Sequence, residues 1–318
     1  MPLAFFMAVL LNTVTPQVRA QIPQKEPVPE RKEIAFVSDT QAPLWVENIF
    51  LKSNHNREAT GLIFQDIIKN KPKALFILGD VVSLGYREAK WKNIDKYLQA
   101  CRENGIEFHA LLGNHDVMGR PHKGESNFQK RFPDHIRTGY VSVVDSVGVV
   151  MVNSNFGKLT STEIDLQQKW YEETLKSLDK DPKVKVVIVT CHHAPYSNSK
   201  LVGSSKPVQE HFVPAFLSSK KAELFITGHS HTFEHFKIKE KDFLVIGGGG
   251  GLHQPLNGKL EDTAVKYKPM FHYLTVLRTG NVLHVISHFL KDDFSGFDKT
   301  YEFSTAIPKV TTAGSNLH

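Results

Sequence analysis

Five short clusters of potential metal ligands, each directly after an apolar run, constrain this chain more than any other feature of its sequence. Such apolar runs predict buried strands, and a sheet brings the residues that follow its strands to one edge. Carboxylate, carboxamide and imidazole groups are ligands for Mn, Fe, Zn and similar divalent ions. The pattern therefore predicts a hydrolytic site with two metal ions. The clusters are Asp39-Thr40-Gln41, Gly79-Asp80, Gly113-Asn114-His115-Asp116, His192-His193 and Gly228-His229-Ser230-His231.

Taken one at a time, these clusters are weak evidence for a site. Gly79-Asp80 alone is typical of a turn from strand to loop, and Gly113-Asn114-His115-Asp116 of a turn with Asn at positive φ. Their joint occurrence favours a metal site, because each cluster follows a predicted strand of its own. Those strands are Ile34–Val37, Ala74–Leu78, Phe108–Leu112, Val184–Val189 and Leu224–Ile226.

Helical patterns alternate with the strands. Apolar residues recur at helical spacing in two segments, one ending before Pro72 and the other at Gly105. A third helix is predicted to begin at Thr160, where Glu163 completes a capping box, and to run through Leu166 and on to Leu178. Residues 140–144 and 149–152, separated by a turn, predict a hairpin. With 318 residues, 41% of them hydrophobic, the chain is long enough for one domain with a sizeable core.

The five clusters resemble the motifs of the calcineurin-like metallophosphoesterases, from roughly Glu33 to Phe289. The resemblance implies an α/β (α+β) fold, a four-layer α-β-β-α sandwich of mixed sheets with its site at the carboxyl ends of strands. It also suggests how the chain divides. We expect a signal peptide at 1–20, a linker at 21–32, the phosphoesterase domain at 33–290 and a partly disordered C-terminal extension at 291–318.

The same resemblance implies a role for each polar residue of the clusters. Asp80 is expected to bridge two divalent ions, and His115 occupies the place of the non-ligand histidine that helps the leaving group depart. His192, the first residue of its pair, is the expected ligand there. The implied ligands are Asp39, Gln41, Asp80 and His231 for one ion, and Asp80, Asn114, His192 and His229 for the other.

Elementary chemistry supports these roles. Two cations about 3.5 to 4 Å apart clamp a phosphoryl group, and a bound water whose pKa falls from about 15.7 toward 7 becomes the nucleophile. Charge develops on the leaving oxygen during in-line attack, so a proton donor is needed opposite the nucleophile. His115 is placed for that duty. Asp116 or a remote carboxylate orients it, or Asp116 instead caps the turn.

Departures from the family pattern narrow the expected metal ions and substrates. Gln41 stands where many members have histidine, which favours a harder ion such as Mn or Fe over Zn at that position. Ser83 stands where purple acid phosphatases need tyrosine for ferric iron, so a purple iron site is not expected. The Asp and Arg of the protein Ser/Thr phosphatase motif are absent between Gly79 and Gly85, which argues against a phosphoprotein substrate.

Residues near the clusters leave alternatives open. His193 either supports the ligands or substrate, or is a loop histidine in water. His109 is interpreted as a buried strand histidine. The run Gly247–Gly251 predicts a close approach of backbone to the site, with His253 just after it. Two cysteines, Cys101 and Cys191, are expected to be buried thiols, although a bridge between them is the other reading.

The N-terminus predicts export. Leu3–Leu11 is an apolar core too short to span a bilayer, and Val18-Arg19-Ala20 offers small residues for cleavage before Gln21. We therefore expect a secreted or periplasmic protein without stable membrane insertion. The formal net charge of +6 comes from scattered Lys and Arg, which suits an anionic small-molecule substrate but no specific nucleic-acid partner.

Two functions are consistent with the sequence. The first is an exported enzyme that hydrolyses small-molecule phosphate mono- or diesters with two divalent ions (Mn, Fe or Zn) and with His115 assisting the leaving group. The second is a metal-binding module of the same fold, catalytically weak because of Gln41. Enzyme is favoured, because every other position of the ligand set is kept.

Overall fold

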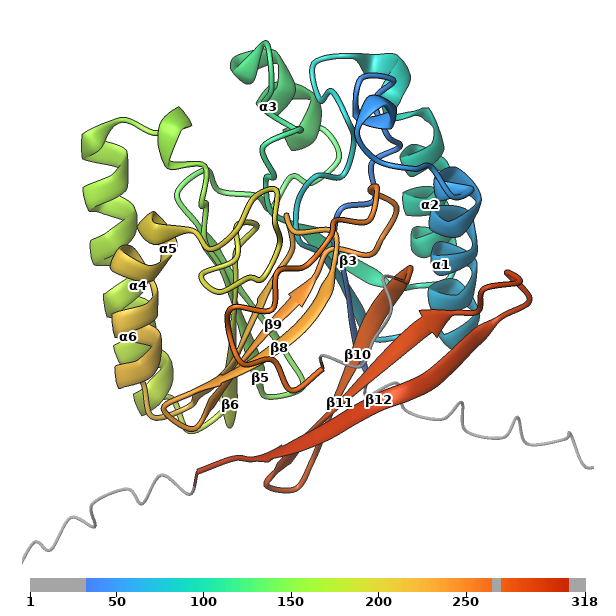
Figure 1. Ribbon diagram of the computed structural model, residues 1–318. Helices are drawn as coiled ribbons and strands as arrows, with labels where there is room; N and C mark the ends of the chain where they lie inside the picture. Colours follow the sequence, from blue (N-terminus) through green and yellow to red (C-terminus); the bar gives the residue numbers. More distant parts are fainter. Residues whose placement is uncertain (1–32, 265–269, 309–318) are drawn as a thin grey trace, which may run out of the picture. The chain divides into compact units, whose positions relative to one another are not determined.

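Two six-stranded sheets pack face to face between two layers of helices in the computed structural model, which describes residues 33–264 and 270–308 (Figure 1). Both sheets mix parallel and antiparallel neighbours. The predicted fold class, a four-layer α-β-β-α sandwich, is confirmed.

The first sheet has the strand order β12-β11-β10-β1-β2-β3. Its β1, β2 and β3 run parallel, so their carboxyl ends lie at the same edge. The remaining strands add to β1 in antiparallel fashion. The strands are β1 (Ile34–Val37), β2 (Ala74–Ile77), β3 (Glu107–Ala110), β10 (His272–Thr279), β11 (Val282–Leu290) and β12 (Phe297–Ala306).

The second sheet has the order β4-β5-β6-β7-β9-β8. Four of its strands, β5, β6, β7 and β9, are parallel, and an antiparallel hairpin partner flanks them at either edge. The strands are β4 (Tyr140–Val144), β5 (Val147–Met151), β6 (Val186–Thr190), β7 (Ala222–Thr227), β8 (Phe233–Ile238) and β9 (Lys241–Ile246).

Helices cover the outer face of each sheet. The first two lie on the first sheet, while α4, α5 and α6 lie on the second (Figure 1). The helices are α1 (Asn56–Asn70), α2 (Lys92–Glu103), α3 (Pro121–Gln129), α4 (Ser161–Lys180), α5 (Lys206–His211) and α6 (Val213–Ser218), with single 3₁₀ turns η1 (Glu47–Ile49), η2 (Glu88–Lys90) and η3 (Phe156–Lys158).

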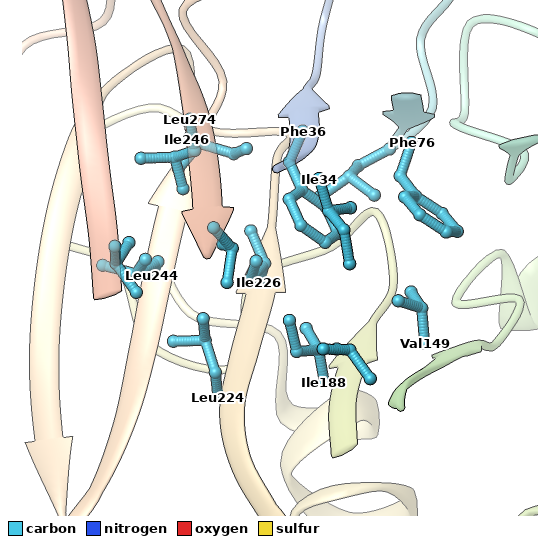
Figure 2. Close-up of a cluster of buried hydrophobic side chains, with 14 of the residues drawn as sticks. Ile34, Phe36, Phe76, Val149, Ile188, Leu224, Ile226, Leu244, Ile246 and Leu274 are labelled. Atoms are coloured by element: carbon cyan, nitrogen blue, oxygen red, sulfur yellow. The ribbon is translucent and has the colours of Figure 1, made fainter. Parts of the chain in front are cut away.

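The central core lies between the two sheets, where strand residues of alternate positions meet (Figure 2). Figure 2 shows Phe36 and Phe76 of the first sheet facing Ile188 and Ile226 of the second. All four side chains are fully buried. Because both outer faces are covered as well, the central strands are apolar throughout, as buried parallel strands usually are.

Most predicted elements are confirmed, with bounds that differ by two residues or fewer for the five strands before the clusters. The capping box is present at Thr160 and Glu163. The hairpin is also present, but its turn is only Asp145-Ser146, so β5 begins earlier than predicted. Leu166 of α4 is exposed, because the buried face of that helix runs through Tyr171 and Leu175 instead.

The predicted end of the domain at residue 290 is one strand too early. Strand β12 pairs along the length of β11 and completes the first sheet, so Phe297–Ala306 belongs to the sandwich. The predicted signal peptide and linker, and the last ten residues of the predicted extension, lie outside the described residues.

The structure also bears on the two cysteines and on helices that could cross a bilayer. Both cysteines are buried and free, Cys101 on the inner face of α2 and Cys191 just after β6, which settles the alternatives in favour of thiols. Burial raises the pKa of Cys101 to about 11. Among the described residues, no helix is both long and apolar enough to cross a bilayer.

Candidate metal centre

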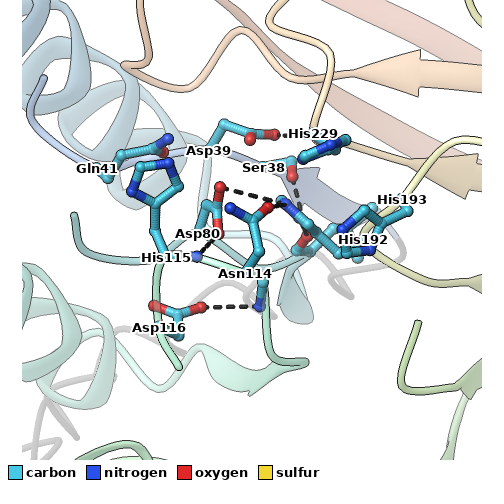
Figure 3. Close-up of polar contacts among 12 residues, drawn as sticks. Ser38, Asp39, Gln41, Asp80, Asn114, His115, Asp116, His192, His193 and His229 are labelled. Carbon is cyan, nitrogen blue, oxygen red and sulfur yellow. Dashed lines mark hydrogen bonds and ion pairs between the residues drawn. The ribbon is translucent and has the colours of Figure 1, made fainter. Parts of the chain in front are cut away.

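The five clusters meet where the carboxyl ends of both sets of parallel strands come together. Three clusters follow β1, β2 and β3 of the first sheet, and two follow β6 and β7 of the second. Figure 3 shows the labelled side chains turned toward one another across this junction. Two groups of side chains lie close enough to hold a cation, and both contain Asp80.

The first group consists of Asp39, Asp80 and His231, all buried, with ligand atoms within 4.8 Å of one another. His231 Nε2 lies 3.3 Å from Asp39 Oδ1. The other ring nitrogen, Nδ1, lies 2.7 Å from the Leu252 carbonyl oxygen and donates to it. That bond fixes the ring so that Nε2 is directed at the carboxylates, which is how protein histidines are usually prepared for a metal.

Gln41 joins this first group through its side-chain amide. When the amide nitrogen donates to the backbone carbonyls of Asp39 (3.0 Å) and Asp80 (2.9 Å), the amide oxygen faces His231 Nε2 at 3.3 Å. This orientation satisfies both amide hydrogens, so it is the one we adopt. The oxygen is then directed at the same place as the Asp39 and His231 ligand atoms.

The second group consists of Asp80, His192 and His229. His192 Nε2 lies 3.2 Å from Asp80 Oδ2 and 3.2 Å from Asn114 Oδ1. Its Nδ1 donates to the Leu78 carbonyl at 2.9 Å, so its tautomer is fixed in the same manner as that of His231. The predicted ligand residues of the second ion therefore lie together, and Asp80 lies in both groups.

The free oxygen atoms of this site suit cations. Asp39 Oδ1 and Asp80 Oδ2 are buried and accept no hydrogen bond. A buried carboxylate oxygen without a partner is costly, and a metal ion removes that cost. Each of these oxygens faces the Nε2 atom of an imidazole whose Nδ1 is bound to a backbone carbonyl. The residues present therefore fit two divalent ions, although each ligand assignment stays a prediction.

The pKa shifts agree with a site that attracts positive charge. Burial raises the pKa of Asp80, but the nearby His192 and His115 outweigh burial and hold that pKa well below its ordinary value. Burial lowers the pKa of His192. The charge of Asp80 outweighs burial and raises the pKa of His192 to about 9. Burial lowers the pKa of His229 well below its usual range, which favours the neutral, ligating imidazole.

The backbone is strained where it presents the ligands. Asp39, Asp80 and His229 have positive φ angles of 58°, 48° and 67°. Non-glycine residues rarely adopt this conformation, and it concentrates at functional sites. Asn114 is not among the residues with positive φ, which the turn-only alternative for its cluster requires. The positive φ angles fall instead two or three residues after the ends of β1, β2 and β7.

The glycine run approaches the site as predicted. Gly249 N and Gly251 N each donate at 2.9 Å, to the carbonyls of Ser38 and Asp39 respectively. A Cβ atom on Gly251 would overlap the His231 ring. Glycine is therefore needed here for close packing of backbone against a ligand. His253, just beyond the run, packs against Phe271 and belongs to neither ligand group.

His115 lies beside the ligands but in neither group. Its backbone N–H donates to Asp80 Oδ1 at 2.7 Å, and its Nδ1 lies 3.2 Å from the Ser83 carbonyl. Nε2 is thereby directed into the pocket, 4.0 Å from Glu47 Oε1. This placement matches a proton donor that does not bind metal.

Asp116 caps the turn and does not orient His115. It accepts backbone N–H bonds from Val81 (3.3 Å), Val82 (3.2 Å) and Gly113 (2.9 Å). Burial and the charge of Asp80 raise the pKa of Asp116 to about 7, against the pull of these three donors. The carboxylate that lies near the His115 ring is Glu47, whose Oε1 is 4.0 Å from Nε2, and its orienting role stays a prediction.

The remaining histidines near the strands are structural. His193 packs against His229 with ring centroids 4.3 Å apart, and its Nδ1 lies 2.8 Å from Ser154 Oγ. It therefore supports a predicted ligand and is not a free loop histidine. His109 stacks on Phe76 within β3, in agreement with its interpretation as a strand histidine.

A pocket of about 310 Å³ opens above the ligands. Five predicted site residues line it, together with residues that sequence reasoning did not single out. The strongest missed signal is a row of large apolar residues just after the first cluster, around the short 3₁₀ turn η1. The unanticipated lining residues are Glu47, Phe50, Leu51, Leu201, Val202 and Gln254.

The sequence matches the calcineurin-like phosphoesterase family over residues 32–233, more than half of the chain. The chain belongs to this family. The matched range contains all five clusters, so the predicted resemblance is confirmed. Members are generally phosphoesterase hydrolases, and the family together with the two ligand groups indicates divalent-metal binding. No curated protein gives a significant match.

Several solved structures share this fold at low sequence identity. GAP50, the anchor in the inner membrane complex of Plasmodium, is 16% identical with a TM-score of 0.63 over 87% of this chain and 89% of that one. Purple acid phosphatase PPD1 from yellow lupin is 15% identical (TM-score 0.65), over 86% of this chain but only 53% of that one. A dimetal phosphatase from Danio rerio is 12% identical (TM-score 0.56), over 87% and 99%.

The first prediction concerns Gln41. Gln41→His is expected to shift the ratio of Zn-supported to Mn-supported activity toward Zn by about tenfold, because imidazole is the better Zn ligand and changes around metal sites commonly have this size. Metal content and activity with each ion measure the shift. Gln254→His, which adds an imidazole elsewhere in the pocket, should leave the ratio unchanged. An unchanged ratio in Gln41→His would mean that Gln41 binds no metal and only donates to the carbonyls of Asp39 and Asp80.

Proposed function

We propose that this protein is a phosphoesterase with two divalent ions that hydrolyses phosphate mono- or diesters of small molecules. One observation carries the proposal: two ligand groups share the buried Asp80, and a non-ligand histidine lines the pocket beside them. Two adjacent cations with one bridging carboxylate are the usual arrangement for in-line displacement at phosphorus.

When bound, the two cations would draw charge from the phosphoryl oxygens and lower the pKa of the water molecule that attacks phosphorus. The chain contributes the rest. Asp39, Gln41, Asp80 and His231 would hold one ion, while Asn114, His192 and His229 would complete the site of the other with Asp80.

His115 would protonate the leaving group. As the water oxygen bonds to phosphorus, the bond from phosphorus to the alcohol oxygen breaks and that oxygen takes a proton. His115 Nε2 reaches the pocket because Nδ1 is held at the Ser83 carbonyl, so it is the chain's donor for that proton. The Glu47 carboxylate lies 4.0 Å from this nitrogen and also faces the pocket.

Export is a further part of the proposal. The apolar core Leu3–Leu11 and the small residues before Gln21 suit a cleaved signal peptide, which would place the enzyme in the periplasm or outside the cell. N-terminal sequencing of the protein from culture medium or periplasm checks it, with a first residue of Gln21 as the expected result.

The alternative is a binding module of the same fold with little turnover. GAP50, an anchor, has a similar fold at low identity, so fold does not decide between them. The ligand groups favour the enzyme, because both keep their carboxylates and imidazoles and the candidate donor His115 is also present.

Metal content and turnover test the proposal together. Protein purified without chelator is expected to contain about two divalent ions per chain, the stoichiometry of two-metal sites. It should release phosphate or p-nitrophenolate from p-nitrophenyl phosphate or its bis ester when supplied with Mn, Zn or Mg. A metal content far below about one ion per chain would contradict the two-metal site, if added Mn or Zn does not restore it. Bound metal without turnover would favour the module.

A further inference from the structure

Large exposed apolar side chains gather beside the metal centre. Ten large hydrophobic residues are exposed in the described ranges, and six of them lie on two short segments that border the pocket. Scattered apolar residues on a surface need no explanation, but a concentration beside a pocket marks a place for an apolar ligand or partner. The six residues are Trp45, Val46, Ile49, Phe50, Leu201 and Val202.

Four apolar side chains enter the lining of the pocket itself. Phe50, Leu51, Leu201 and Val202 line the same volume as the metal-centre residues. Phe50 is 80% exposed and Leu201 is 55% exposed, so neither is packed into the protein core. The pocket therefore combines a polar metal centre with an apolar side that stays open to solvent.

Backbone hydrogen bonds hold both apolar segments in place. Leu201 N and Val202 N donate to Ser199 Oγ at 3.2 and 3.3 Å, and Ser199 pairs with Leu256 in an isolated bridge. In the other segment, Phe50 N donates to the Glu47 carbonyl at 3.1 Å. These bonds order the backbone of both segments, and Phe50, Leu201 and Val202 line the pocket from there.

The charge of the pocket restricts what else a substrate can carry. Neither lysine nor arginine occurs among its described lining residues, and Glu47 adds a carboxylate beside His115. Extra phosphate groups, as in a nucleoside triphosphate, are normally held by arginine or lysine. Beyond the one phosphoryl group at the metals, this pocket suits an uncharged and apolar remainder.

We propose that the substrates are phosphate esters of an extended apolar alcohol, such as an alkyl chain. The phosphoryl group would lie at Asp80, and the chain would lie against Phe50, Leu201 and Val202. This inference rests on the proposed phosphoesterase function and names its substrate class. Phe50 and Leu201 are then specificity residues, which contact the substrate away from the reacting atoms.

Binding of non-hydrolysable alkylphosphonates tests the inference without turnover. Calorimetry on metal-loaded protein with chains of two, four, six and eight carbons is expected to show affinity rising by up to about fourfold per methylene, the value for full burial of a CH₂ group. Release of phosphate from the matching alkyl phosphates should follow the same order in kcat/KM. AMP and ATP should be poor substrates.

Serine substitutions supply the matched variants. Phe50→Ser and Leu201→Ser should flatten the dependence on chain length, while the ethyl compounds change little. Both residues are exposed, so the fold should tolerate the changes. Ile136→Ser is the control, because Ile136 is 56% exposed and is not among the pocket residues; its chain-length dependence should equal that of the wild type.

The outcomes separate this inference from the function on which it rests. Ester hydrolysis with a flat dependence on chain length, or with a preference for ATP, would overturn the inference and leave the phosphoesterase. Phosphonate binding that rises with chain length without any turnover would defeat the enzyme and overturn the substrate assignment, leaving only an apolar ligand site at Phe50 and Leu201. Phe50-dependent sedimentation with phosphatidylcholine vesicles, combined with flat phosphonate binding, would assign the apolar residues to a membrane surface and overturn the inference.

Discussion

Asp80→Asn should abolish phosphate-ester hydrolysis and remove metal from both positions. Asp80 is the one residue common to the two ligand groups, and its Oδ2 is buried without a hydrogen-bond partner. A neutral amide cannot balance two divalent charges as a carboxylate does. The loss of metal affinity should therefore exceed the roughly 10- to 100-fold typical of residues that only support a ligand.

The fold should survive this substitution. Residue 80 has φ of 48°, which asparagine tolerates better than most residues. The oxygen of the introduced amide could still accept from the His115 N–H, and its NH₂ group could donate to His192 Nε2. The melting temperature of metal-free protein should thus stay near the wild-type value, while the rise on adding Mn or Zn should disappear.

Elemental analysis, melting with and without metal, and turnover measure these effects. Asp165→Asn, a change of the same kind at an exposed site on α4, should leave all three unchanged. Asp39→Asn should cost one ion more than the other, because Asp39 lies in only one group. Wild-type turnover in Asp80→Asn would show that Asp80 does not bridge.

The local parts of this site could be predicted from sequence. An apolar run such as Ile34–Val37 must be buried, and a polar residue directly after it must lie at the end of a strand. Because β1, β2 and β3 turned out parallel, their three clusters converge as expected. The glycine run was also informative, since only glycine allows backbone to pack as closely as Gly251 does on His231.

The contacts between distant segments could not be predicted. Nothing in the apolar runs says that β6 belongs to a second sheet. The sequence of β12 is largely polar, so it does not reveal that this strand pairs with β11. The place of Glu47 in the site could not be predicted either, because its approach to His115 depends on how a loop folds back. Phe50 and Leu201 are 151 residues apart in numbering, so only the fold reveals that they line one pocket.

Replacing His115 with glutamine should slow hydrolysis of alkyl phosphates by about 10²- to 10⁴-fold, the usual contribution of general acid catalysis. Metal content should stay at the wild-type level, because His115 lies in neither ligand group. Its backbone N–H bond to Asp80 Oδ1 does not depend on the side chain. His122→Gln, at an exposed position of α3, is the matched control and should have wild-type rates.

The choice of leaving group makes this prediction specific to proton donation. An alkoxide leaves poorly unless it is protonated, whereas p-nitrophenolate is stable as an anion and needs little help. The loss in His115→Gln should therefore be large for hexyl phosphate and small for p-nitrophenyl phosphate, with the same metals bound. Equal losses on both esters would mean that His115 acts by its charge on the phosphoryl group. Loss of metal in the variant would make His115 a ligand. The pocket would then need another proton donor, for which Glu47, a lining residue 4.0 Å from His115 Nε2, is the candidate.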